Sequence, residues 1–83
     1  MQPTVGRVVI ALVNPITNNG ADVAPAVITR VWDEHTGGGW TVNYKVLLDQ
    51  NGNRWVTSAR LFDSEEQARV HDGVAAFWPP RVG

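Results

Sequence analysis

Apolar and polar residues alternate most regularly between positions 40 and 49. One face of an extended chain would carry Trp40, Val42, Tyr44, Val46 and Leu48, and the other Thr41, Asn43, Lys45 and Asp49, with Leu47 as the exception. This period of two predicts a strand with one buried face and one face toward water. Asn51-Gly52 follows, and because both residues accept positive φ, the pair favours a type I′ hairpin turn. Arg54–Ser58 is therefore predicted as the partner strand.

Three further short runs predict strands. Val8–Val13 is rich in β-branched residues and is typical of a buried strand. Ala26–Trp32 is the second strand, with Pro25 at its start, where a missing N–H costs least. Val74–Trp78 is a short closing strand before two prolines. The three consecutive glycines at 37–39 predict a flexible polar tip between the second and third strands. They do not predict a phosphate-binding loop, because such a loop needs a following helix.

One segment, Asp63–Val70, predicts a short helix. Ser64 can cap the first amides, and Gln67 stands at the capping-box position three residues later. Gly73 is expected in the C′ role after the last turn.

These elements predict the fold class. Eighty-three residues are enough for one core without disulfides or metals. Five short strands and one helical turn indicate an all-β domain over residues 1–83, a small five-strand SH3-like barrel. Closure of such a barrel removes the exposed edges that a short β-chain would otherwise present.

Composition and charge narrow the classes of function. The net charge is −1 and the seven basic residues are scattered, whereas nucleic-acid binding needs clustered cations. Folding could still gather Arg54, Arg60 and Arg81 on one face. The absence of cysteine excludes disulfides and thiolate chemistry and is compatible with a reducing cytoplasm. Val8–Val13 is too short for a signal-peptide core or a membrane span, so we expect no membrane association.

Catalytic and metal-binding patterns are weak. His35 and His71 stand in loop contexts without a positioned partner, and acid–base catalysis needs both a partner and a pocket. The run Asp33-Glu34-His35 lacks the paired spacing of a zinc site. The sequence therefore predicts no enzyme activity, no metal and no cofactor.

The aromatic residues are the remaining candidates for function. Four tryptophans are many for so small a core, and exposed aromatic and arginine side chains are typical of binding hot spots. We expect at least two of the tryptophans to fill the core or to anchor a loop. The predicted partner-binding surface consists of Trp32, Trp40, Tyr44, Trp78, Pro79 and Arg81.

Several segments resemble a family of short uncharacterised proteins from actinobacteria and their phages. They are Gly6-Arg7-Val8-Val9, Ala24 to Trp32, Val42 to Val46, and Phe77-Trp78-Pro79-Pro80-Arg81-Val82. The family has a Gly-Arg start, an Ala-Ala-Ile-Val-Thr-like second strand and a Thr-Trp-His-Trp-Pro ending. This chain departs from that ending at Ala75-Ala76-Phe77-Trp78, so no role for the family's histidine carries over. The resemblance implies a phage or actinobacterial source and no particular activity.

Together these observations lead to a hypothesis with two alternatives. The leading one is a non-enzymatic protein–protein interaction module of a phage, acting on a host protein in the cytoplasm of the bacterial host. The first alternative is a virion component, such as a capsid decoration or tail-associated protein. The second is a single-stranded nucleic-acid binder, because small barrels stack bases on exposed aromatics. The oligomeric state stays open, since a free strand edge could pair two copies.

Overall fold

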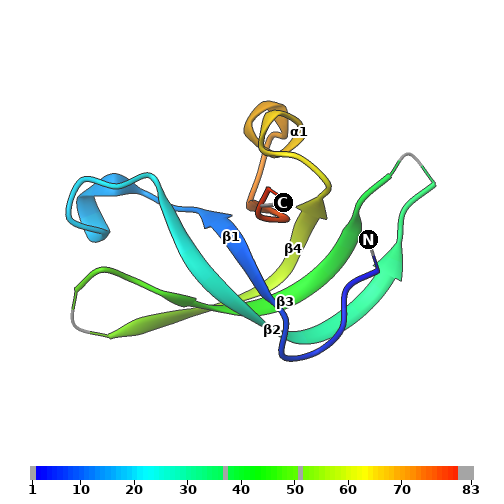
Figure 1. The fold of residues 1–83 in the computed structure, drawn as a ribbon, viewed down its shortest axis with the longest axis horizontal. Coiled ribbons are helices and arrows are strands. Elements are labelled where there is room, and N and C mark those ends of the chain that lie inside the picture. The colour runs from blue at the N-terminus through cyan, green and yellow to red at the C-terminus, as the bar shows by residue number, and fades with distance from the viewer. Residues whose placement is uncertain (1, 37, 51, 81–83) are drawn as a thin grey trace.

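The computed structural model describes residues 2–36, 38–50 and 52–80, which form a five-strand barrel (Figure 1). In chain order its elements are β1 (Val8–Leu12), the 3-10 helix η1 (Pro15–Thr17), β2 (Val23–Glu34), β3 (Trp40–Leu47), β4 (Asn53–Phe62), α1 (Glu65–Val70) and β5 (Ala75–Phe77). The barrel is closed in the order β1-β2-β3-β4-β5. The predicted fold class, a small all-β barrel of five strands with one short helix, is confirmed.

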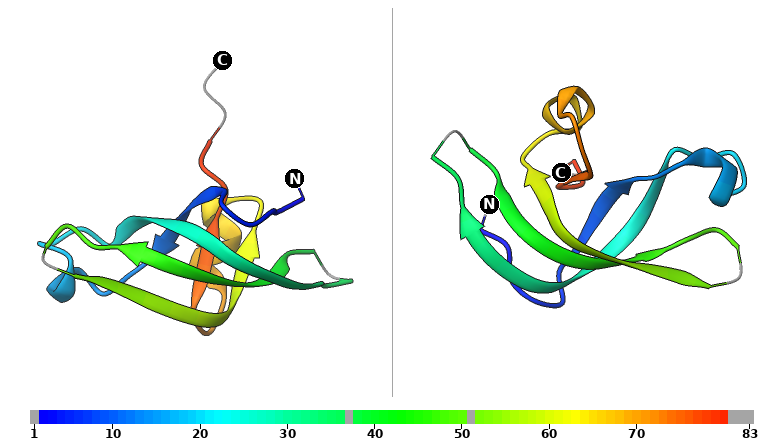
Figure 2. Two further views of the ribbon diagram at one scale, coloured as in Figure 1. Left: turned by 90° about the horizontal axis from the view of Figure 1, so that it is seen from below. Right: turned by 180° about the vertical axis from the view of Figure 1, so that it is seen from behind.

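Strand β5 closes the barrel between the first and the fourth strands. It pairs antiparallel with β1 and parallel with β4, whereas the other neighbours are antiparallel hairpins. Strands β2, β3 and β4 are long and curved, and the β1–β2 connection and the β3–β4 hairpin project to the same side of the molecule (Figures 1 and 2). Helix α1 packs on β4 and β5.

The barrel interior is filled by residues that alternate along each strand, as the period of two predicts. Its buried members are Val9, Ala11, Ala24, Ala26, Ile28, Val42, Tyr44, Val46, Ala59, Leu61, Ala76 and Trp78. A second, smaller cluster of Ala68, Ala75 and Phe77 lies between α1 and the outer side of the closing strand. Many of these residues are alanines, which leave room at the centre for the few large side chains.

Strand β2 is longer than predicted and contains Pro25 within it. Pro25 lies opposite Ile10 of β1, but the β2–β3 ladder begins only at Ala26. The proline therefore stands one residue outside that ladder, and its missing N–H breaks no bond there. The prediction that Pro25 precedes the strand is corrected for this reason.

The hairpin of β3 and β4 is confirmed, but its connection is not a two-residue turn. The last ladder pair is Leu47 with Asn53, so five residues, 48–52, connect the strands. Gly52 has a φ of +95°, and Asn51 lies outside the described residues. Strand β4 runs on to Phe62, four residues beyond the predicted end, because Ala59 and Leu61 alternate into the core.

The β2–β3 connection makes a close approach to β4 at Gly39. Its φ is +88°, and a Cβ built there would lie 3.0 Å from the carbonyl oxygen of Leu61. Only glycine fits both requirements. The amide of His35 donates to the Gly39 carbonyl at 2.9 Å, which closes the hairpin loop. Gly37, the first residue of the predicted glycine tip, lies outside the described residues.

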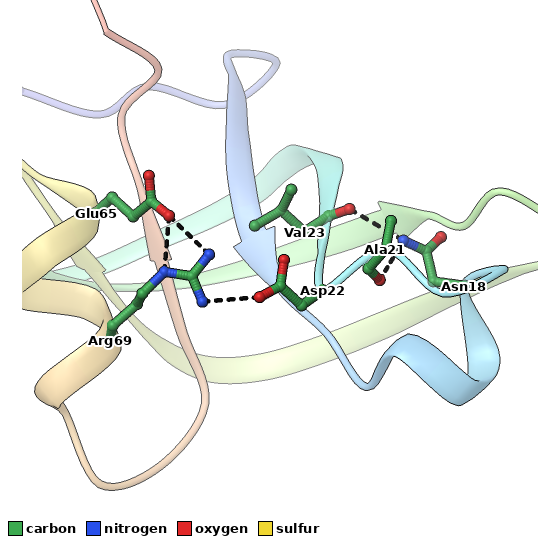
Figure 3. Close-up of polar contacts among 6 residues, drawn as sticks. All are labelled: Asn18, Ala21, Asp22, Val23, Glu65 and Arg69. Atoms are coloured by element: carbon green, nitrogen blue, oxygen red, sulfur yellow. Dashed lines mark hydrogen bonds and ion pairs between the residues drawn. The ribbon is translucent and has the colours of Figure 1, made fainter.

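Helix α1 begins as predicted and ends differently. The Ser64 hydroxyl accepts from the Gln67 amide at 3.3 Å, which confirms the N-cap. The helix ends at Val70, and the backbone of its C-cap residue, His71, is extended. Gly73 (φ +134°) therefore serves the turn into β5, and its predicted C′ role is wrong. Arg69 donates to Glu65 in its own helix and to Asp22 in the β1–β2 connection (Figure 3), and these bonds raise its pKa, Asp22 contributing most.

Asn18 holds the β1–β2 connection together from a buried position. Its Nδ2 donates to the carbonyls of Ala21 and Val23, each at 3.0 Å (Figure 3). Its Oδ1 accepts from the Asp49 amide at 2.6 Å, and Asn19 donates to the Asp49 carbonyl. The buried amide is satisfied on both sides, so the tips of two hairpins are tied together.

Candidate functional site

A groove of about 580 Å³ opens in the barrel wall between the end of β1 and the first half of β4. Residues 12–14 form one side, residues 54–57 the other, and residues 73–75 its end, while Tyr44 and Val46 lie at its base. Most of these residues are apolar. Val74 and Trp55 are 53% and 57% exposed, so two partly exposed apolar side chains flank the cavity.

The groove exists because β5 is short. Strand β4 has ten residues, and β5 has three, which pair only with Arg60–Phe62. Before Ala75 the chain turns away toward α1. Within residues 2–36, 38–50 and 52–80, the first half of β4 therefore has β3 on one side and no strand on the other.

The ladder geometry shows which backbone groups of β4 face the groove. The amide of Ile28 donates to the Arg7 carbonyl and its carbonyl accepts from Gly6, so both backbone groups of Ile28 point toward β1. Ile28 lies opposite Tyr44. Because the backbone groups of opposed residues either face each other or both face away, those of Tyr44 point to β4, where its partner is Val56.

Direction alternates from residue to residue along a strand. If the N–H and C=O of Val56 face β3, those of Trp55 and Thr57 face the groove. The Ser58 amide, which donates toward β3 to Asn43 at 2.8 Å, agrees with this direction. Within the described residues no strand pairs with β4 on this side before Arg60. Two donors and two acceptors are therefore presented to the groove.

Among the described residues that line the groove, Arg54 is the one that carries a charge. It lies opposite the buried Val46, so its side chain leaves the strand on the inner face, as does that of Val56. Arg54 is exposed. In the part of the chain that the structure describes, no hydrogen bond or ion pair involves its guanidinium.

Tyr44 lies at the base of the groove and is fully buried. Its hydroxyl is 3.5 Å from the carbonyl oxygen of Ala75, a long and weak contact. Burial disfavours the phenolate and raises the pKa of Tyr44 to about 12. The hydroxyl is therefore neutral at physiological pH, and its proton points to the Ala75 carbonyl.

The predicted partner-binding surface does not form as one surface. Tyr44 and Trp78 are 0% and 7% exposed, so the prediction is wrong for these two: a core built largely of alanine and valine needs them to fill its centre. Trp40 is half-buried against the core, whereas Trp32 and Pro79 are exposed. Arg81 lies outside the described residues.

Trp32 is held on the outer face of the sheet by contacts within the chain and does not present a free aromatic surface. Its Nε1 donates to Asn43 Oδ1 at 2.9 Å, and the same oxygen accepts from the Thr57 hydroxyl at 3.1 Å and the Ser58 amide. The guanidinium of Arg30 lies 3.7 Å from the Trp32 ring centroid. One ring face is thus covered, and the indole N–H is used. Asn43, predicted to face water, is buried beneath this cluster.

Trp55 and Val74 are exposed apolar residues of the groove that the predicted partner-binding surface did not include. Trp55 lies opposite Lys45, on the outer face of the sheet. The alternation of β3 already placed Lys45 on that face, so the observed register would have indicated an exposed Trp55.

The two histidines lie away from the groove. The His71 ring packs on Phe62 with centroids 5.2 Å apart, and His35 hydrogen-bonds Thr41. Among residues 2–36, 38–50 and 52–80, no three histidine or acidic side chains gather to hold a metal ion. Nor does that part of the chain contain a helix long and apolar enough to cross a membrane.

The comparisons with known proteins leave the fold and the groove as the basis for function. No protein-family model, curated protein or solved structure matches the chain.

Proposed function

We propose that this barrel is a non-enzymatic protein-binding module whose partner enters the groove between β1 and β4. The observation that carries the proposal is the groove itself, about 580 Å³ in volume, lined mainly by apolar residues. Val74 and Trp55 at its rim are more than half exposed. Exposed apolar rims around a cavity are typical of interaction sites.

The resemblance to actinobacterial phage proteins gives the proposal its biological setting. A phage protein of this kind would act on a host protein in the bacterial cytoplasm, and a virion partner is the alternative. Two arginines already have partners within the chain, which disfavours nucleic acid as the ligand. Arg69 pairs with Asp22 and Glu65, and Arg30 lies over the ring of Trp32. Base stacking needs a free aromatic face beside a cationic track, and among the described groove residues near the exposed Trp55 only Arg54 is cationic.

Two variants at exposed valines test the proposal. Val74→Arg places a long charged side chain at the groove, whereas Val70→Arg places the same side chain on α1, where Val70 is 82% exposed and does not line the groove. Both are expected to fold. We expect cross-linked complexes formed by the parent chain in an actinobacterial lysate to persist with Val70→Arg and to be lost with Val74→Arg. Equal capture by the two variants would show that the groove is not the binding site.

A further inference from the structure

We propose that the groove takes an extended peptide, which adds as a strand to the free edge of β4 and places a carboxylate against Arg54. This inference rests on the proposed function and specifies the ligand of the same groove. Its first support is the backbone: the N–H and C=O groups of Trp55 and Thr57 face the groove. Residues two apart with both groups free are what an added strand requires.

The added strand would occupy a defined position in the barrel. Strand β5 lies between β1 and β4 but pairs with β4 only from Arg60 to Phe62. A peptide beside Trp55 and Thr57 continues that position along the open half of β4. It therefore completes the sheet where the chain's own closing strand is absent.

The side chains around this position specify the peptide sequence. Val56 and Arg54 leave β4 on the inner face, two residues apart, and Val74 stands across the groove. Side chains on one face of an added strand are also two residues apart. An apolar side chain beside Val56 thus places the next side chain of that face near the guanidinium of Arg54. The fitting sequence is an apolar residue and an acidic residue separated by one residue.

The same charge argues against a second copy of the chain as the occupant. Two copies paired edge to edge through Trp55 and Thr57 around a two-fold axis would place Arg54 of each copy opposite Ser58 of the other, so neither guanidinium would meet a carboxylate. An acidic peptide has the complementary charge.

A pair of variants at Thr57 tests the backbone pairing. Thr57→Pro removes the N–H that faces the groove and breaks no ladder bond to β3, whereas Thr57→Val keeps that N–H. Both lose the hydroxyl bond to Asn43, so Thr57→Val is the matched control. The probe is the capped, fluorescently labelled peptide Thr-Asp-Thr-Val-Thr-Asp-Thr, which reads the same in both strand directions.

We expect saturable binding of this peptide by fluorescence anisotropy, weakened about tenfold by Thr57→Pro and unchanged by Thr57→Val. Arg54→Glu tests strand addition even if Thr57→Pro fails to fold. Because Arg54 is exposed, this variant is expected to fold. It should weaken the Asp peptide by roughly threefold and favour the peptide with Lys in place of Asp, as for an exposed ion pair.

Four outcomes overturn strand addition. They are no saturable binding of either peptide, equal effects of Thr57→Pro and Thr57→Val, no change in charge preference with Arg54→Glu, and self-association of the parent chain that Thr57→Pro abolishes. Loss of lysate partners with Val74→Arg, together with equal peptide binding by the two Thr57 variants, would leave the proposed function standing and remove this inference. Capture of partners by Val74→Arg would remove both.

Discussion

The two halves of β4 have the same backbone partner on one side and different surroundings on the other. Arg60 and Leu61 lie between β3 and β5, with Leu61 fully buried. Residues 54–57 have β3 on one side and the groove on the other. The difference arises outside β4, in the three-residue length of β5. A barrel can therefore be closed at one end of a strand and open to a ligand at the other.

Truncation of core side chains should separate the two halves most strongly. Leu61→Ala leaves a cavity in the closed half, and we expect a loss of about 2–5 kcal/mol in the free energy of unfolding. Val56→Ala, at a half-buried position in the open half, should cost roughly 1 kcal/mol or less, because part of its surface is already hydrated. Urea unfolding followed by tryptophan fluorescence measures both. Equal losses would contradict the distinction.

Alkaline pH should destabilise the barrel through Tyr44, at the base of the open half. The unfolded chain loses the phenolic proton near pH 10, but the folded chain keeps it until about pH 12. The unfolded state therefore binds fewer protons between these values, and stability falls as the pH rises through them. The contribution is fully present below pH 10, and its loss is about 3 kcal/mol at most.

Urea unfolding at pH 9, 10, 11 and 12 measures this loss, with Tyr44→Phe as the control. The phenylalanine variant lacks the titrating group and keeps the ring in place. A difference in stability between parent and variant that stays constant across this range would show that Tyr44 does not cause the decline.

The junction between the halves should depend on Asn43. Val42 pairs with Ala59 and Tyr44 with Val56, so the two β4 residues between them, Thr57 and Ser58, oppose the single residue Asn43. This is a β-bulge, and Ser58 adopts a φ of +55°.

Asn43→Ala leaves the Ser58 amide and the Trp32 indole without their acceptor. We expect a loss of about 1–3 kcal/mol in the free energy of unfolding. Thr57→Val, which removes one of the three bonds, should lose less. Thermal or urea unfolding of both variants decides whether the side-chain amide stabilises the bulge.

Hydrogen exchange should distinguish the two halves of β4 in the parent protein, without any substitution. The amides of Trp55 and Thr57 face the groove and should exchange rapidly. Val56, bonded to β3, and Arg60, whose amide donates to the Val74 carbonyl at 3.1 Å, should exchange at least about a hundredfold more slowly. Exchange measured by NMR would thus alternate fast, slow, fast over 55–57. Uniform exchange over these three residues would show that the edge is not arranged in this way.

The sequence predicted those parts of the fold that local patterns control. The alternation of β3 indicated its buried face, and the Ser64 cap located the start of α1. The register of the β3–β4 hairpin could not be obtained in the same way. A two-residue turn at Asn51-Gly52 would place Trp55 opposite Leu48, whereas the five-residue connection places it opposite Lys45. A shift by an odd number of residues reverses the face of every side chain, so turn length decides whether Trp55 is buried or exposed.

The groove itself depends on an element boundary that sequence patterns locate poorly. Val74–Trp78 reads as one apolar run, and its first residue leaves the strand only because the chain turns at Gly73. The number of aromatic residues led to the inclusion of Tyr44 and Trp78 in the predicted partner-binding surface, although the alternation of β3 had placed Tyr44 on its buried face. Their burial follows from the three-dimensional filling of the barrel, which depends on how many small residues face inward from all five strands.

The pairing of the first strand with the last also determines the order of folding. Ile10 pairs with Phe77 and Ala11 with Ala76, so these contacts join the two ends of the described chain. Closing so long a loop costs chain entropy before its contacts can offset it, and β5 is therefore expected to dock late. Until it docks, β1 and β4 both carry open edges along their full lengths, which favours intermolecular pairing. The slowest step of folding and the time of greatest aggregation risk are thus one event, controlled by residues 75–77.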